Sequence, residues 1–292
     1  MSVASVPQNS IQTAPRRLRS LALPLLAAFA GGLGASVYLR GPFQRSRMFL
    51  PDRYPNGTWD PAAEGLEAED CWFSTDDGVR LHGWWMPQDQ AECTVLYYHG
   101  NSGSIGLRLD VFRVLRALPI NLFAFDYRGY GRSAGSPSVA GLVQDARAAY
   151  DYLVRHHGQR ADQLFLFGHS MGGALAVETA LARLSSGVVV ESAFTSIRDM
   201  TRARYPKLPL HLVARDYFRN IDKVPHMPVP KLFIHGTGDT VVPFQQGRQL
   251  YERALAPKSF YSVAEADHND LHLLGGEGYR RALMEFFHSS MS

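Results

Sequence analysis

The amino-acid sequence predicts an α/β protein built on a mostly parallel β-sheet with helices on both faces. From residue 70 onward strand-like and helix-like runs alternate, and most strand-like runs are continuously apolar, which is typical of strands buried on both faces. The chain has 292 residues, 46% of them hydrophobic, which is enough for one large α/β domain or two small ones. Because residues 70–292 contain no internal repeat and no low-complexity linker, we expect one domain there.

Local patterns predict each element. The runs "CWFS" and "VRLHGWWM" flank Asp77-Gly78, which indicates an antiparallel hairpin. Residues 138–155 carry apolar side chains at helical spacing, with Ser138 in the N-cap position. Six apolar runs complete a predicted sheet of eight strands, at residues 94–100, 121–127, 163–168, 187–192, 231–236 and 259–264.

Four polar elements follow predicted strands directly. In open parallel sheets, reactive groups lie on loops just beyond the carboxyl ends of the strands. These positions are taken by the loop His99-Gly100-Asn101, Ser170, Asp239 and His268. Ser170 lies within Gly168-His169-Ser170-Met171-Gly172, which fits the pattern G-x-S-x-G, and the glycines permit a sharp strand-to-helix turn. The pattern alone is short, so its context has to supply a base, an acid and an oxyanion hole.

The residues that could activate Ser170 also follow strands. A serine hydroxyl is a poor nucleophile until a base accepts its proton, and an imidazole base needs an acid that fixes its tautomer. His268 is the candidate base and Asp239 the candidate acid, with Glu191 as the alternative acid because it too ends a strand. The chain order Ser170, Asp239, His268 favours Asp239. Asp126 precedes the serine in a turn-rich loop, and we expect a structural role for it.

An oxyanion hole needs two preorganised donors, one of them the backbone N–H of the residue after the nucleophile. That residue is Met171. The glycine-rich loop "HGNSGS" after the first long parallel strand would supply the second donor, the N–H of Asn101; an ordinary glycine turn is the alternative.

Taken together, the segments "YYHGNSGSIGLR", "FDYRGYGRSAG", "GHSMGG", "HGTGDTVVP" and "DHND" resemble a serine hydrolase of the α/β-hydrolase superfamily over about residues 70–290. The lead-in "RMFLPDRY" with "STDDGVRLHGWWMP" is similar to a subgroup with an N-terminal membrane anchor and a small helical cap, related to serine aminopeptidase-like hydrolases and to protein depalmitoylases. The resemblance implies the α/β-hydrolase fold, a triad of Ser170, Asp239 and His268, and oxyanion donors at Asn101 and Met171. The palmitoylated depalmitoylases differ in having a cysteine-rich N-terminal tail, whereas this chain has no cysteine before Cys71.

The two cysteines, Cys71 and Cys93, are expected to be unbonded. Neither belongs to a CxxC pair, so zinc and thioredoxin-like chemistry have no support. The strand order implied by the resemblance separates the two by three inter-strand spacings of about 4.8 Å, or roughly 14 Å, which is beyond disulfide reach.

The N-terminal region predicts a membrane segment. Residues 1–19 form a basic tail, and residues 20–39, "SLALPLLAAFAGGLGASVYL", are twenty uncharged residues bounded by Arg19 and Arg40, just long enough to cross a bilayer core. A cleaved signal peptide, which would give a secreted protein, is the alternative because Ala28-Phe29-Ala30 resembles a cleavage site. Arginines lie on both sides of the segment, and export of the C-terminal domain is only weakly favoured. Residues 40–69 form a lead-in segment.

Charge is distributed unevenly along the chain. Residues 1–40 hold four of the 30 Lys and Arg residues and no acid, so residues 41–292 carry 26 basic and 27 acidic residues, a balance that argues against a nucleic-acid partner. Residues 195–230, the predicted cap, carry seven basic and three acidic residues. This surface is either a solvated face or one that faces anionic lipid headgroups. A helix with one apolar stripe is predicted in the cap from the spacing of Leu210, Val213, Ala214, Tyr217 and Phe218.

The sequence therefore predicts a membrane-anchored serine hydrolase that cleaves carboxylic esters or thioesters of small acyl or lipid-like molecules through an acyl-enzyme. No metal or organic cofactor is expected. The alternatives are a serine peptidase of the aminopeptidase type and a non-catalytic ligand-binding protein of the same fold. A dehalogenase or epoxide hydrolase would need a carboxylate nucleophile at position 170, where this chain has serine. Acyl length and oligomeric state are left open.

Overall fold

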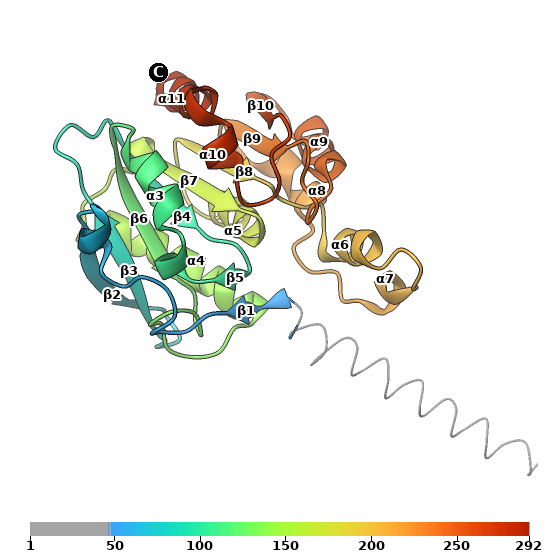
Figure 1. The fold of residues 1–292 in the computed structure, drawn as a ribbon, viewed down its shortest axis with the longest axis horizontal. Helices are drawn as coiled ribbons and strands as arrows, with labels where there is room; N and C mark the ends of the chain where they lie inside the picture. Colours follow the sequence, from blue (N-terminus) through green and yellow to red (C-terminus); the bar gives the residue numbers. More distant parts are fainter. Residues whose placement is uncertain (1–45, 47, 292) are drawn as a thin grey trace, which may run out of the picture.

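The computed structural model describes residues 46 and 48–291, and within them the centre of the molecule is one eight-stranded sheet (Figure 1). The strand order is β10-β9-β8-β7-β4-β6-β3-β2. β3 is antiparallel to both of its neighbours, β2 and β6, and all other neighbours are parallel, which confirms the predicted sheet and its N-terminal hairpin. The strands are β2 (Glu69–Ser74), β3 (Arg80–Met86), β4 (Cys93–Tyr98), β6 (Ile120–Asp126), β7 (Leu164–His169), β8 (Gly187–Glu191), β9 (Lys231–Gly236) and β10 (Lys258–Val263).

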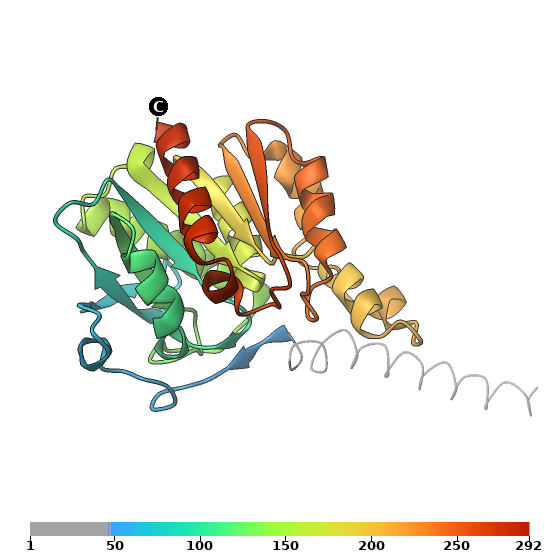
Figure 2. The same ribbon diagram turned by 45° about the horizontal axis from the view of Figure 1, so that its top comes forward.

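Helices cover both faces of this sheet (Figure 2). α3, α10 and α11 pack on one face, and α4, α5 and α9 pack on the other. The helices are α3 (Leu109–Arg116), α4 (Val139–His156), α5 (Met171–Ala180), α6 (Ile197–Arg204), α7 (Leu210–Val213), α8 (Asn220–Lys223), α9 (Phe244–Arg253), α10 (Leu271–Leu274) and α11 (Gly276–Met291). Short 3₁₀ turns occur at Pro61–Glu64, Ile105–Leu107, Ala161–Gln163 and Val224–His226.

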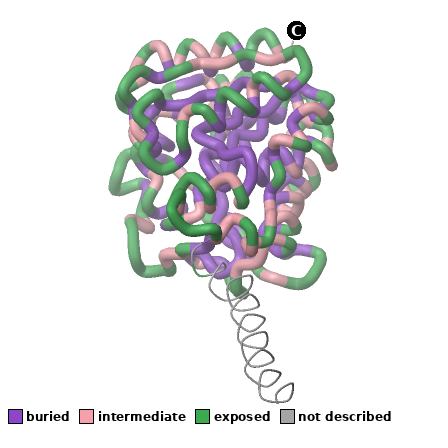
Figure 3. The backbone as a smooth tube through the Cα atoms, turned by 90° about the vertical axis from the view of Figure 1, so that its right-hand side faces the viewer, coloured by how far each residue is buried: buried purple, intermediate pink, exposed green. Residues whose placement is uncertain are grey.

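The apolar strands fill two separate cores. Successive side chains of a strand point to opposite faces, so Leu96 and Tyr98 enter one core while Val95 and Tyr97 enter the other. Strands that must fill both cores are apolar at every position, which explains the continuous apolar runs of the sequence. Figure 3 shows the result, a buried centre under helices whose outer surfaces are exposed.

The predicted helix over residues 138–155 is confirmed as α4. Ser138 is its N-cap, and the Ser138 side chain accepts a hydrogen bond from the Gly141 N–H at 3.1 Å. The two cysteines also behave as predicted. Cys71 in β2 and Cys93 in β4 are buried and free, and β3 and β6 lie between their strands.

One prediction for the cap is wrong. The apolar stripe from Leu210 to Phe218 forms no continuous helix, because α7 ends at Val213 and Ala214 is extended. Phe218 has a positive φ of 49° and turns its side chain into the core, where it is 4% exposed. Tertiary packing therefore bends the segment so that Phe218 is buried while the rest of the stripe stays partly exposed, and α6 and α7 lie together beyond the sheet (Figure 1).

The chain reaches the sheet through a short extended segment. β1 (Leu50–Pro51) pairs in parallel with β5 (Ser102–Gly103), the loop that follows β4. The predicted basic tail and membrane segment, residues 1–39, lie outside the described residues. Within residues 46 and 48–291, no helix combines the length and the apolar character that crossing a membrane requires.

Candidate active site

Ser170 stands at the turn between β7 and α5 in a strained conformation. Its φ is 55° and its ψ is −117°, a combination that a non-glycine residue seldom adopts. The Ser170 N–H donates to the carbonyl of Glu191 at 2.8 Å, which ties the turn to the end of β8. A Cβ at Gly168 would lie 2.2 Å from the Gly172 oxygen, so the turn can close only with glycine there. The G-x-S-x-G glycines thus allow the turn that exposes the serine hydroxyl to the loops above the sheet.

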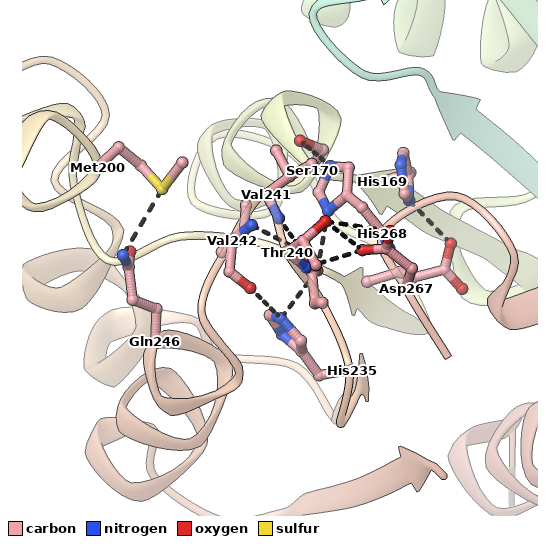
Figure 4. A network of polar contacts seen from close by, with 12 residues as sticks. His169, Ser170, Met200, His235, Thr240, Val241, Val242, Gln246, Asp267 and His268 are labelled. Atoms are coloured by element: carbon pink, nitrogen blue, oxygen red, sulfur yellow. Dashed lines mark hydrogen bonds and ion pairs between the residues drawn. The ribbon is translucent and has the colours of Figure 1, made fainter. Parts of the chain in front are cut away.

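The structure brings the three predicted residues into one hydrogen-bonded chain, of which Figure 4 labels Ser170 and His268. The Ser170 Oγ lies 3.0 Å from His268 Nε2, and His268 Nδ1 lies 2.8 Å from Asp239 Oδ2. All three are buried, at 7%, 6% and 9% exposure for Ser170, His268 and Asp239. They come from loops after three different strands, β7, β9 and β10, that meet at one edge of the sheet.

Asp239 is held as a carboxylate by donors on both of its oxygens. Its Oδ1 accepts the N–H groups of Val241 and Val242 at 2.9 and 2.7 Å. Its Oδ2 accepts a hydrogen bond from His268 Nδ1, and His235 Nε2 lies 3.2 Å from the same oxygen. Burial alone would raise the pKa of Asp239, but the bonds from His235 and His268 outweigh it, and the pKa lies well below the ordinary value. Asp239 is therefore ionised next to the imidazole that it orients.

The alternative acid, Glu191, serves a different histidine. Its Oε1 lies 3.0 Å from His169 Nδ1, and its Oε2 accepts the Tyr279 hydroxyl at 2.6 Å. Burial lowers the pKa of His169 despite this partner, so we assign a neutral ring that donates to an ionised Glu191. The His169 ring lies 5.0 Å from that of His268 (centroid to centroid) and packs beside it. Glu191 makes no hydrogen bond to His268 within the described residues, which favours Asp239 as the acid.

The two predicted oxyanion donors belong to residues near Ser170. Met171 is the first residue of α5, where a backbone N–H has no carbonyl partner within the helix. Asn101, Ser170 and Met171 line the same cavity. A Cβ on Gly100 would lie 3.5 Å from the Ser170 Cβ, so the peptide between Gly100 and Asn101 passes close above the serine.

Other polar groups hold the loop that carries Asn101. His99 Nδ1 lies 2.8 Å from the Gly100 oxygen, and the Asp126 Oδ1 accepts the Ile105 N–H at 2.9 Å. Asp126 is fully buried at the end of β6, beneath this loop, in keeping with the structural role expected for it. Within residues 46 and 48–291, no group of three His, Cys, Asp or Glu side chains is placed to hold a metal ion.

A cavity of about 370 Å³ opens above Ser170. Its walls come from five segments of the chain and are mostly apolar. Within the described residues the lining contains no carboxylate, and Arg204 is its one charged side chain. The lining residues are Met48, Leu50, Asn101, Ser170, Met171, Phe194, Ile197, Met200, Thr201, Arg204, Tyr205, Leu210, Val213, Ala214, Val241 and Val242.

Comparison with known proteins places the chain in a family. It is 32% identical over 290 residues to the Alpha/beta hydrolase domain-containing protein WAV2 of Arabidopsis thaliana, covering 90% of this chain and 93% of that protein. The chain belongs to the α/β-hydrolase superfamily. It is also 33% identical to protein bem46 of Schizosaccharomyces pombe over 264 residues, covering 84% of this chain and 85% of that protein.

Two further comparisons agree with this assignment. The family model described as "Serine aminopeptidase, S33" matches residues 89–222. The solved structure of the Pyrococcus furiosus esterase Pf2001 superposes with a TM-score of 0.68 at 22% identity, covering 84% of this chain and 99% of that chain, which shows a common fold. The α/β-hydrolase fold is thereby established, and hydrolase activity in general is supported.

The structure adds residues to this region that the sequence patterns did not single out. His235 is the last residue but one of β9 in "KLFIHG", the same run that precedes Asp239, but nothing in the sequence distinguishes it from other buried histidines. His169 occupies a variable position of G-x-S-x-G. Met48 and Leu50 reach the cavity from the lead-in segment, about 120 residues before Ser170. No local pattern carries that information.

Proposed function

We propose that this protein is a serine hydrolase that cleaves carboxylic esters or thioesters by way of an acyl-enzyme. The observation that carries the proposal is the hydrogen-bonded chain from Ser170 through His268 to Asp239 at the floor of an apolar cavity. The relatives that are hydrolase-domain proteins, and the esterase of similar fold, support the same class of reaction.

Each residue has a defined step in the proposed reaction. The Ser170 Oγ attacks the carbonyl carbon while His268 Nε2 accepts its proton, and Asp239 stabilises the resulting imidazolium. The N–H groups of Asn101 and Met171 receive the negative carbonyl oxygen. When the intermediate collapses, His268 returns the proton to the leaving alcohol or thiol, and Ser170 keeps the acyl group. Water activated by His268 then releases the acid and regenerates Ser170.

The lining of the cavity favours an acyl substrate over a peptide with a free amino terminus. Release of an N-terminal residue requires a carboxylate that binds the cationic amine, and within the described residues no Asp or Glu lines the cavity. Apolar side chains such as Met200 and Leu210 suit an acyl chain instead. Arg204, the one charged side chain of the lining, repels a cation and attracts an anion.

Labelling with a fluorophosphonate tests the nucleophile. The reagent reacts with an activated serine and loses fluoride, so we expect one adduct on the folded full-length protein, mapped by mass spectrometry to Ser170. Ser170→Ala should remove it. Ser192→Ala is the matched control, because Ser192 also follows a strand with a positive φ, of 46°, but its Oγ has no hydrogen-bond partner within the described residues. Folded wild-type protein that takes no label, or a label that survives in Ser170→Ala, would refute the proposal.

We further propose that the protein works at a membrane surface. Residues 20–39 are the predicted anchor, and an exported catalytic domain is the orientation we favour. The cap supports a second contact, because it carries four more basic than acidic residues and exposes Leu208 and Leu212 at 52% and 67%. Cations attract anionic headgroups, and exposed leucines enter the headgroup boundary. Such an arrangement would place the mouth of the cavity near lipid esters.

Turnover of a lipid ester in vesicles tests this second contact. A cap variant, in which four cap arginines are replaced by Gln, removes the proposed charge contact. We expect it to lose about tenfold or more of its turnover on anionic vesicles and little on zwitterionic ones, since each cation near an anionic surface contributes about 1 kcal/mol to binding. Four arginines outside the cap provide a control of equal charge change. Equal losses in the two variants, or none in either, would exclude the cap contact. The cap variant replaces Arg202, Arg204, Arg215 and Arg219 by Gln, and the control replaces Arg155, Arg160, Arg280 and Arg281 by Gln.

A further inference from the structure

The segment over residues 48–54, here called the N-terminal strap, contains β1 and runs along the loop that carries Asn101. Its Leu50 N–H donates to the Asn101 oxygen at 3.0 Å, and its Asp52 N–H donates to the Gly103 oxygen at 3.1 Å. Farther along, the Tyr54 N–H donates to the Gly131 oxygen at 3.1 Å. The strap thus binds two loops on the active-site edge of the sheet, through these main-chain hydrogen bonds and through the Arg53 side chain, whose Nη2 donates to the Gly135 oxygen at 3.0 Å.

Both peptide groups that flank the Asn101 Cα are held in place. The preceding one contains the Gly100 oxygen, which His99 Nδ1 contacts at 2.8 Å, and the N–H of Asn101 itself. The following peptide contains the Asn101 oxygen. This oxygen accepts one hydrogen bond from the Leu50 N–H and another, at 2.9 Å, from the Tyr130 hydroxyl. With both peptides held, the direction of the Asn101 N–H is restricted, and Asn101 lines the cavity together with Ser170. A donor that is fixed before the reaction stabilises the oxyanion without a reorganisation cost.

The strap also forms one wall of the cavity. Met48 and Leu50 line it opposite the cap, and Met48 and Phe49 are buried at 7% and 6% exposure. These buried side chains fix the strap on the core, so its main-chain donors stay in register with the loop. The matched family model does not cover the strap, because the match begins at residue 89.

We propose that the N-terminal strap is a working part of the active site, in which the Leu50 main chain positions the Asn101 oxyanion donor and the Leu50 side chain contacts substrate. This inference rests on the proposed serine hydrolase activity. The two functions of Leu50 separate in their kinetic consequences. The Leu50 N–H positions a donor that acts only in the transition state, so its loss affects kcat. The Leu50 side chain contacts the substrate equally in the ground state and the transition state, so its loss affects KM.

Two substitutions at position 50 separate these functions. Leu50→Pro removes the N–H that bonds the Asn101 oxygen and sets the proline ring against that oxygen, while the fixed φ of proline is compatible with an extended backbone. Because losing an oxyanion donor outright lowers kcat about 10²- to 10³-fold, we expect misplacement of Asn101 to lower kcat for a neutral ester about 10- to 100-fold with KM within about twofold. Leu50→Ala keeps the N–H, so we expect kcat within about threefold and a higher KM.

Tyr130→Phe removes the other donor to the Asn101 oxygen and decides the question if Leu50→Pro does not fold. We expect it to lower kcat about 3- to 10-fold with little change in KM, since the Leu50 donor remains. With wild-type turnover present, an unchanged kcat in folded Leu50→Pro, or in Tyr130→Phe where Leu50→Pro does not fold, overturns the proposed positioning of the Asn101 donor while leaving the serine hydrolase intact. Folded wild-type protein with neither fluorophosphonate labelling nor ester turnover overturns both proposals.

Discussion

Asp239→Asn is expected to lower kcat/KM for any ester substrate by about 10⁴-fold while the protein stays folded, as loss of the acid does in other Ser-His-Asp enzymes. In this chain the Asp239 Oδ2 accepts a hydrogen bond from His268 Nδ1 at 2.8 Å. An amide nitrogen in that place donates rather than accepts, so the His268 ring would take the tautomer with its proton on Nε2. That nitrogen could then no longer accept the proton of Ser170. Steady-state kinetics with one neutral ester measures the effect.

Glu191→Gln is the matched comparison, because Glu191 is the alternative acid considered above and is buried at the end of β8. Its carboxylate binds His169 and Tyr279 and makes no hydrogen bond to His268 within the described residues. We expect a loss of activity below about tenfold, together with a loss of stability of about 1–3 kcal/mol from the disturbed buried bonds. If Glu191→Gln reduced kcat/KM more than Asp239→Asn did, the assignment of the acid would be wrong.

The sheet and the position of the site could be predicted because both depend on features that are local in the sequence. A continuous apolar run marks a strand buried on both faces, and the carboxyl ends of parallel strands meet at one edge. Ser170, Asp239 and His268 could therefore be grouped without knowing any contact between them. The same rule also made Glu191 a candidate for the acid. The chain order of serine, acid and histidine favoured Asp239 over Glu191, and the hydrogen bonds agree with that choice.

What could not be predicted depends on contacts between distant parts of the chain. His235 is one of several histidines in apolar surroundings, and only the fold places its Nε2 within 3.2 Å of Asp239. The N-terminal strap has no motif, because main-chain hydrogen bonds such as that from Leu50 can be made by almost any residue. In the cap, the apolar spacing from Leu210 to Phe218 suits a helix, yet the packing of Phe218 into the core prevents one.

Gly172→Ala should destabilise the protein by about 4 kcal/mol, in the range of severe overpacking. Helix propensity alone predicts the opposite sign, because alanine within a helix is favoured over glycine by about 1 kcal/mol. Packing decides the outcome, since a Cβ at Gly172 would lie 1.9 Å from the Tyr98 oxygen and 2.8 Å from the His99 oxygen. Both are main-chain atoms at the end of β4, and they can move only if α5 shifts as a whole.

Gly278→Ala provides the control, because Gly278 also lies within a helix but its Cβ would meet the hydroxyl of Tyr261, which can rotate away. We expect its free energy of unfolding to change by less than about 1 kcal/mol, measured like that of Gly172→Ala by urea unfolding followed by circular dichroism. A stabilised Gly172→Ala protein would contradict the close approach of α5 to β4. Gly172 follows Met171 directly, so a residue required for this packing would also affect the proposed oxyanion hole. Any Gly172→Ala protein that folds should therefore show a kcat lower than its remaining stability would explain.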